Sequence, residues 1–187
     1  MRRMLFKSLA HGPLTEAPPE ADDTALAELA AQVDRAARLR LGRTLSIREV
    51  DAGSCNGCEL EIHALNNVVY DLERFGLRFV ASPRHADVLL VTGPVTTNMR
   101  EALERTYRAT PAPKWVVAVG DCARDGGVFS GSYATVGGVS AVLPVDLHIG
   151  GCPPSPTVLL RGLLALLETV QADTKLNSSA PTSTAES

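Results

Sequence analysis

The sequence has few aromatic residues, little net charge and no long apolar run, and each absence removes a class of function. Aromatic side chains make up 4% of the 187 residues, and the formal net charge is -3. Nucleic-acid binding is therefore set aside, because it depends on a basic surface and, for single strands, on aromatic stacking. No stretch of about 18 apolar residues, the length that crosses a bilayer, occurs in the sequence.

The amino-terminal segment lacks the parts of an export signal. Arg2 and Arg3 superficially resemble a twin-arginine signal, which requires an apolar stretch next. The segment that follows instead, at positions 11–23, reads HGPLTEAPPEADD. We therefore do not expect export, and without an oxidising compartment we do not expect disulfides.

Composition divides the chain into three parts. Residues 1–43 are expected to form a polar tail and an amphipathic helix, residues 44–170 a single α/β domain, and residues 171–187 a flexible, disordered tail rich in Ser, Thr and Ala. The helix, over 24–41, has one apolar face. The sequence leaves open whether this face packs against its own domain, a partner subunit or a membrane surface.

Short apolar strands alternate with helical segments from residue 44 onward. The patterns predict strands at 45–50, 77–81, 88–92 and 115–119, and helices at 59–75, 97–109 and 157–170. Gly76 is placed to end the first of these helices. Strands that alternate with crossover helices indicate a parallel sheet with helices on both faces, so we predict a flavodoxin-like α/β fold.

The four cysteines are Cys55, Cys58, Cys122 and Cys152, a C-x2-C pair followed by two isolated residues. Each group follows an apolar segment: the strand at 45–50, the strand at 115–119, or the short segment VDLHIGG. Because ligands gather at the carboxyl ends of parallel strands, these distant cysteines are expected to converge on one edge of the sheet. Glycines that let the backbone pass close to a bulky cofactor flank them: Gly53, Gly57, Gly120, Gly126, Gly127, Gly150 and Gly151.

Four converging thiols have more than one chemical use. An iron–sulfur cluster needs thiolate ligands and backbone donors that tune its potential, and Cys58 is expected to begin a helix whose N-terminus favours thiolate. Structural zinc is the chief alternative, although its sites usually come as two C-x2-C knuckles and this chain has one. Disulfides and unrelated buried thiols remain as further alternatives. The pattern favours a single 4Fe-4S cluster.

A family resemblance rests on four segments: CNGCELEIHA (55–64), SPRHADVLLVTGPVT (82–96), VGDCARDGGVF (119–129) and PVDLHIGGCPPSPTVLLRGL (144–163). They resemble the small subunit of membrane-associated group 4 NiFe hydrogenases of the formate hydrogenlyase type. The family of complex I subunits that carries the last cluster before quinone is more distantly similar. Those subunits typically have adjacent cysteines, whereas Asn56 and Gly57 separate Cys55 from Cys58 here, as in the hydrogenases.

The resemblance implies that Cys55, Cys58, Cys122 and Cys152 ligate one proximal 4Fe-4S cluster. It implies an oxidoreductase subunit without a catalytic metal centre of its own, which carries electrons between a ferredoxin-like iron–sulfur subunit and a NiFe large subunit. Membrane subunits of the same complex would hold it peripherally on the cytoplasmic side of the inner membrane. Two alternatives stay open: a complex I-type NADH/quinone oxidoreductase subunit, and a zinc-stabilised interaction domain without catalysis.

Polar residues near the cysteine motif have both an ordinary and a functional interpretation. Glu59 is a candidate for proton transfer, because the resemblance links acidic residues near this motif to proton movement. Glu61 fits a solvated carboxylate in a first helical turn, and His63 fits either a hydrogen bond to a cluster or a structural position. Arg84, His85 and His148 have no role that the sequence assigns.

Overall fold

The central element of the computed structural model is a parallel β-sheet, and the structure describes residues 23–75 and 77–178. Within these residues the sheet has the strand order β2-β1-β3-β5-β7, and every neighbouring pair is parallel. The strands are β1 (Ser46–Asp51), β2 (Arg78–Phe79), β3 (Val88–Thr92), β5 (Trp115–Val119) and β7 (Leu147–Ile149). This is the flavodoxin-like order, with a switch point between β1 and β3, so the predicted fold is confirmed.

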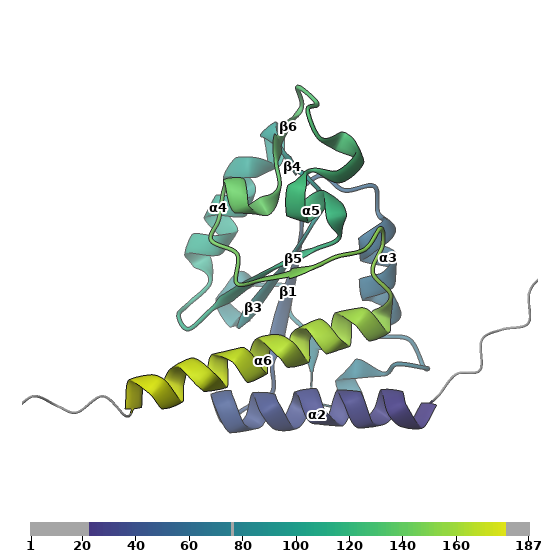
Figure 1. Ribbon diagram of the computed structural model, residues 1–187, viewed down its shortest axis with the longest axis vertical. Helices are drawn as coiled ribbons and strands as arrows, with labels where there is room; N and C mark the ends of the chain where they lie inside the picture. The colour runs from purple at the N-terminus through teal and green to yellow at the C-terminus, as the bar shows by residue number, and fades with distance from the viewer. Residues whose placement is uncertain (1–22, 76, 179–187) are drawn as a thin grey trace, which may run out of the picture.

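Helices cover both faces of the sheet (Figure 1). One face carries α2 (Asp23–Leu41), α3 (Gly57–Ala64) and α6 (Pro156–Ser178), and the other carries α4 (Thr97–Ala109) and α5 (Asp121–Asp125). A small antiparallel pair, β4 (Val95–Thr96) and β6 (Thr135–Gly137), contacts α4 and α5. Short 3-10 helices complete the described elements: η1 (Leu72–Phe75), η2 (Pro83–His85), η3 (Gly127–Phe129) and η4 (Val139–Ala141).

The central strands are buried along their whole length. Every residue of β3 and β5 is buried, as expected for parallel strands covered on both sides. Successive side chains alternate between the two layers: Leu90 and Val117 join the core under α2 and α6, and Leu89 and Val116 join the core under α4 and α5. The sheet therefore forms a rigid platform between two aliphatic cores, and its strand ends can position loops precisely.

Helix α2 packs against its own chain. Its residues Ala30, Val33 and Ala37 are fully buried, and the last two share a core with Leu159 and Leu163 of α6. Figure 1 shows the two helices side by side beneath the sheet. Of the three surfaces that the sequence left open for this helix, the structure shows the intramolecular one.

The predicted helix over 59–75 is wrong in its second half, since α3 ends at Ala64. The chain then turns at Asn67, whose Oδ1 accepts hydrogen bonds from the N–H groups of Val69 (2.8 Å) and Tyr70 (3.0 Å). Side-chain bonds of this kind compete with helical backbone bonds and end the helix. The helical spacing resumes only in the 3-10 helix η1. Gly76, predicted to end the helix, lies outside the described residues.

Two other elements also differ in length from the sequence prediction. β2 is shorter than the strand predicted at 77–81, and α6 continues to Ser178 rather than ending near residue 170. The start of the predicted disordered tail is therefore helical, because QADTKLNS contains neither Gly nor Pro to end the helix. The remainder of both predicted tails, at 1–22 and 179–187, lies outside the described residues.

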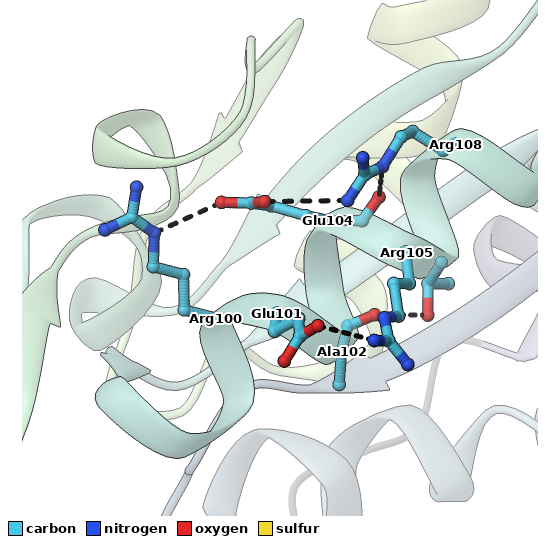
Figure 2. A network of polar contacts seen from close by, with 7 residues as sticks. Arg100, Glu101, Ala102, Glu104, Arg105 and Arg108 are labelled. Carbon is cyan, nitrogen blue, oxygen red and sulfur yellow. Dashed lines mark hydrogen bonds and ion pairs between the residues drawn. The ribbon is translucent and has the colours of Figure 1, made fainter.

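Figure 2 shows a polar network on the exposed side of α4. Arg100 and Arg108 both pair with Glu104, and Arg105 pairs with Glu101. All these pairs lie four residues apart, the spacing at which charged side chains meet on a helix. Exposed pairs of this kind each stabilise a helix by only about 0.3–0.5 kcal/mol, so we assign the network to the stability of α4.

Replacing Leu163 of α6 by alanine is expected to destabilise the domain by about 2 to 5 kcal/mol, because its side chain is fully buried in the core that α6 forms with α2 and the sheet. Urea unfolding of the full chain measures this loss. The matched control is Leu39→Ala on α2, whose side chain is 80% exposed. Its effect is expected to stay within about 0.5 kcal/mol. Equal losses in the two variants would contradict the assigned packing of α6.

Candidate cofactor site

The structure brings all four predicted cysteines to one pocket at the carboxyl ends of the strands. Cys55 and Cys58 follow β1, Cys122 follows β5 and Cys152 follows β7. The pocket has a volume of about 120 Å³, and its other lining residues are Ser54, Gly57, Gly93, Asp121, Gly151 and Pro153. Gly93 and Ser54 follow β3 and β1, so the pocket lies at the switch point of the sheet, where folds of this class bind ligands.

The four thiols are free and differ in exposure. Cys122 is buried and Cys58 is half-buried, whereas Cys55 and Cys152 are exposed. The pocket therefore has a closed side, made by the two inner cysteines, and an accessible side, made by the two outer ones. A group held by all four sulfurs would be shielded from solvent on one side and open to a partner on the other.

Two glycines give the inner thiols the space they occupy. A Cβ atom on Gly120 would lie 2.6 Å from the Sγ of Cys58, and one on Gly127 would lie 2.9 Å from the Sγ of Cys122. Both glycines also have positive φ angles, 88° and 48° respectively. Any side chain at either position would displace a thiol, so glycine is required here for both space and conformation.

Burial raises the pKa of the inner thiols. The pKa of Cys58 rises to about 12, chiefly through burial and further through Glu59 and the other three thiols. The pKa of Cys122 is also raised by burial, against a hydrogen bond from the Val128 N–H that lowers it. The effect of the helix N-terminus, which the sequence predicts to favour the thiolate of Cys58, is thus smaller than the effect of burial. Holding these two inner sulfurs as thiolates near neutral pH requires bound cations, whose charge offsets this cost.

Aspartates hold the loops that carry the cysteines, and sequence reasoning missed them. The Oδ1 of Asp51 accepts hydrogen bonds from the N–H groups of Gly53 and Ser54, both at 2.7 Å. In the same way, the Oδ1 of Asp125 accepts one from Gly127 at 2.9 Å. Such short turns are a common use of aspartate, and the signal was present as DAGS and RDGG beside the cysteines.

The other candidate residues lie outside the thiol pocket. Glu59 is buried, with 7% of its surface exposed, and both its carboxylate oxygens lack a hydrogen-bond partner within the described part of the chain. Glu61 is half-buried, and the remaining candidates are exposed: His63, Arg84, His85 and His148. Within residues 23–75 and 77–178, no group of three or more His, Cys, Asp or Glu side chains is placed to hold a single metal ion.

Glu49 is a further residue that the sequence did not single out. Its Oε2 lies 3.7 Å from the Nε2 of His63, and both residues line a second pocket, of about 280 Å³, with Ile62, Asn66 and Phe79. Burial raises the pKa of Glu49; His63 opposes this shift, while Glu59 and Asp51 add to it. A carboxylate inside the strand sequence SIREVD was the available signal, since strands rarely carry one.

The Glu49→Gln variant is expected to have a higher Tm than the wild type at pH 7 and the same Tm near pH 4. Burial raises the pKa of Glu49 above its usual value of 4.5, so the folded chain favours the neutral carboxyl group. The neutral carboxyl group therefore stabilises the fold fully at pH values below 4.5, and this stabilisation is lost as the pH rises through the pKa of the folded state. Glutamine does not ionise. Thermal unfolding at the two pH values checks this, and a lower Tm for the variant at pH 7 would contradict it.

Sequence comparison places this site in a known family. Residues 55–166, more than half of the chain, match the family described as NADH ubiquinone oxidoreductase, 20 Kd subunit. The chain belongs to this family. The match includes all four cysteines of the pocket. This match and the relatives described below together confirm the predicted resemblance to hydrogenase small subunits and to the related complex I family.

Two relatives of this family member are named as a hydrogenase subunit and a hydrogenlyase subunit. It is 47% identical over 128 residues to the probable membrane-bound hydrogenase subunit mbhJ of Pyrococcus furiosus, with 68% of this chain and 77% of that protein covered. It is 45% identical over 132 residues to formate hydrogenlyase subunit 7 of Escherichia coli, with 69% of this chain covered. That match spans 52% of the E. coli protein, about half its length.

A solved structure shows the same fold in a larger assembly. A chain of the membrane-bound sulfane sulfur reductase, an archaeal respiratory membrane complex, matches this family member with a TM-score of 0.62 and 33% identity. The match covers 76% of each chain. In the part of this chain that the structure describes, no helix is long and apolar enough to cross a membrane.

Proposed function

We propose that this chain is the electron-transferring small subunit of a multisubunit, membrane-bound NiFe hydrogenase, and that its four cysteines hold one proximal 4Fe-4S cluster. The observation that carries the proposal is the pocket of about 120 Å³ lined by four free thiols from three strand ends. The family is generally one of iron–sulfur proteins, which agrees with this donor set. When bound, such a cluster accepts and releases one electron at a time.

The size and walls of the pocket favour a cluster over zinc. A cavity of roughly 10–15 Å³ accommodates one water molecule, so this pocket is much larger than one ion requires. A zinc ion binds its four sulfurs at about 2.3 Å around a single point, whereas a cubane spreads its thiolates over four iron atoms. The glycine backbone at Gly120 and Gly127 closes on the inner sulfurs, and the Val128 N–H donates to Cys122. Hydrogen bonds to sulfur are one of the means by which a protein sets the potential of a cluster.

The chain's own residues would position and shield the cluster. Cys58 packs against the aliphatic core and Cys122 is buried, so both lie on the side of the pocket that faces away from solvent. Cys55 and Cys152 lie on the exposed side, which a partner subunit must cover to protect the site. We place a NiFe large subunit and a ferredoxin-like iron–sulfur subunit as those partners. Membrane subunits would hold the assembly on the cytoplasmic side of the inner membrane.

The spacing of the first two cysteines supports a hydrogenase over a complex I-type subunit. Asn56 and Gly57 separate them, and Asn56 adopts a left-handed conformation, with φ of 71°, that turns the chain between Cys55 and Cys58. The relatives from Pyrococcus furiosus and Escherichia coli are named as subunits of a hydrogenase and of a hydrogenlyase. The 33% identity to a chain of the sulfane sulfur reductase supports a second candidate, the same electron-transfer role in a complex whose large subunit lacks nickel.

Glu59 remains our candidate for proton transfer beside the cluster. A buried carboxyl group whose oxygens lack hydrogen-bond partners is costly, so we expect Glu59 to meet a donor from outside the described residues. Its neighbour Cys58 is a proposed ligand, which places the carboxyl group next to the site of electron transfer. Among the acidic residues near the motif, Glu59 is more deeply buried than Glu61.

Metal analysis of the anaerobically purified full chain tests the cofactor. We expect a brown protein with about four iron and four sulfide per chain and a paramagnetic signal on reduction. A colourless protein with one zinc per chain would overturn the proposal and establish the interaction-domain alternative. Purification with its large subunit tests the complex: nickel in that subunit supports the hydrogenase, and its absence supports the second candidate.

A further inference from the structure

The loops after β5 and β7 are joined beyond the ends of their strands. The Gly120 N–H donates to the carbonyl of Ile149 at 2.8 Å, and the Asp121 N–H donates to the carbonyl of Gly151 at 2.9 Å. The Gly151 N–H in turn donates to the Oδ1 of Asp121 at 3.1 Å. Asp121 and Gly151 are thus joined by two hydrogen bonds, one donated by the N–H of each residue.

This pair lies directly before two of the four cysteines. Cys122 follows Asp121, and Cys152 follows Gly151, so the bonds between the first residues restrict the separation of the next two. Gly151 has a φ of 137°, and a Cβ on it would lie 2.8 Å from Pro154. The loop therefore requires glycine at this position. Asp121 and Gly151 both line the thiol pocket.

Arg124 holds the carboxylate of Asp121 in place. Its Nη1 lies 3.2 Å from the Asp121 Oδ1, and its Nη2 lies 3.1 Å from the Oδ2 of Asp125. One guanidinium therefore bridges two carboxylates that serve different loops. Asp125 accepts a hydrogen bond from Gly127 in the Cys122 loop, whereas Asp121 accepts one from Gly151 in the Cys152 loop. The carboxylate that links the two loops is therefore that of Asp121.

We propose that Asp121 is a positioning residue, whose carboxylate oxygen fixes the Cys152 loop against the Cys122 loop through the Gly151 N–H. The claim concerns the position of an acceptor oxygen and not the negative charge. Its consequence for a bound cluster rests on the proposed function, whereas the hydrogen bond itself is independent of it.

Three substitutions separate the acceptor from the charge. Asp121→Ala removes both, Asp121→Asn keeps an oxygen at the same distance from the backbone and loses the charge, and Asp121→Glu keeps the charge and displaces the oxygen by one methylene. Asp51→Ala is the matched control, because it removes the aspartate bonds to Gly53 and Ser54 in the Cys55 loop and leaves the contacts of Asp121 in place. Circular dichroism checks that each chain folds. If the alanine variant fails to fold, the asparagine and glutamate pair still decides the question.

The first readout is amide hydrogen exchange at residues 150–152 of the full chain without added iron. We expect exchange of the Gly151 N–H to rise about tenfold in Asp121→Ala and Asp121→Glu, and to stay within about twofold of the wild type in Asp121→Asn and Asp51→Ala. Exchange that is unchanged in Asp121→Ala would overturn the proposal. Wild-type exchange in the glutamate variant with fast exchange in the asparagine variant would also overturn it, because charge would then be the cause.

The second readout is the rate at which the iron-loaded full chain loses iron under mild oxidation. We expect a several-fold faster loss in Asp121→Ala and Asp121→Glu, with rescue in Asp121→Asn. Equal rates in all variants would overturn the positioning role. A wild-type chain that takes up no iron would contradict the proposed function instead, and hydrogen exchange would still decide whether Asp121 holds the loop.

Discussion

Replacing Cys122 by serine is expected to yield a folded chain that no longer retains an intact 4Fe-4S cluster. Cys122 is the most buried of the four thiols, and the backbone of Gly127 closes on its sulfur, so its position in the pocket is fixed closely. A serine hydroxyl is far less acidic than a thiol and supplies a poor anionic ligand for iron. We expect the iron content to fall from about four per chain to three or fewer. Iron and sulfide assays with electron paramagnetic resonance measure this loss.

The matched control for this variant is Ser54→Ala, which changes a residue of the same pocket that supplies no thiol. The Ser54 hydroxyl accepts a hydrogen bond from the Asn56 N–H at 3.1 Å, so its removal disturbs the loop without removing a sulfur. Its iron content is expected to equal that of the wild type. Unchanged iron and sulfide in Cys122→Ser would exclude Cys122 as a ligand and, with it, the proposed donor set.

The fold was predictable where burial and sequence pattern coincide. β3, α4 and β5 have the predicted bounds, because each strand is a continuous apolar run and the helix between them has a polar exposed face. The meeting of the cysteines was predictable for a related reason. The carboxyl ends of parallel strands share one edge, so residues far apart in the sequence reach the same pocket once the strands are identified.

The break after α3 could not be predicted from apolar spacing. Leu65, Val69 and Leu72 keep a helical period, and both leucines are indeed buried, but Val69 is 52% exposed. Hydrogen bonds from the backbone to the Asn67 side chain decide the turn, and spacing does not record them. Here a local polar interaction overrides a correct apolar pattern.

The electrostatics of the site also depends on tertiary structure. The position of Cys58 at the start of a helix suggested a stabilised thiolate, yet burial among three other thiols and Glu59 raises its pKa to about 12. The contact between Glu49 and His63 joins β1 to α3, and no local motif connects the two residues. Both properties follow from which elements pack together, so they appear only after the fold is known.

Gly120→Ala is the substitution we expect to damage both the fold and the site most strongly. Gly120 has φ 88° and ψ 162°, a region that residues with a Cβ avoid at a cost of about 1 to 3 kcal/mol. The added Cβ would also lie 2.6 Å from the Sγ of Cys58, and overpacking adds about 1 to 3 kcal/mol. We expect a total loss of about 2 to 6 kcal/mol and displacement of the thiol. Urea unfolding and iron content measure the two effects.

A second glycine separates the two causes. Gly131 also has a positive φ, 77°, but a Cβ on it would meet no atom within 4 Å. Gly131→Ala therefore introduces conformational strain alone, with an expected cost of about 1 to 2 kcal/mol and a wild-type iron content. If Gly120→Ala also keeps its iron, the expected displacement of the Cys58 thiol by the added Cβ is wrong. If only Gly120→Ala loses iron, the space left by a missing Cβ is part of the cofactor site, because strain is common to both variants.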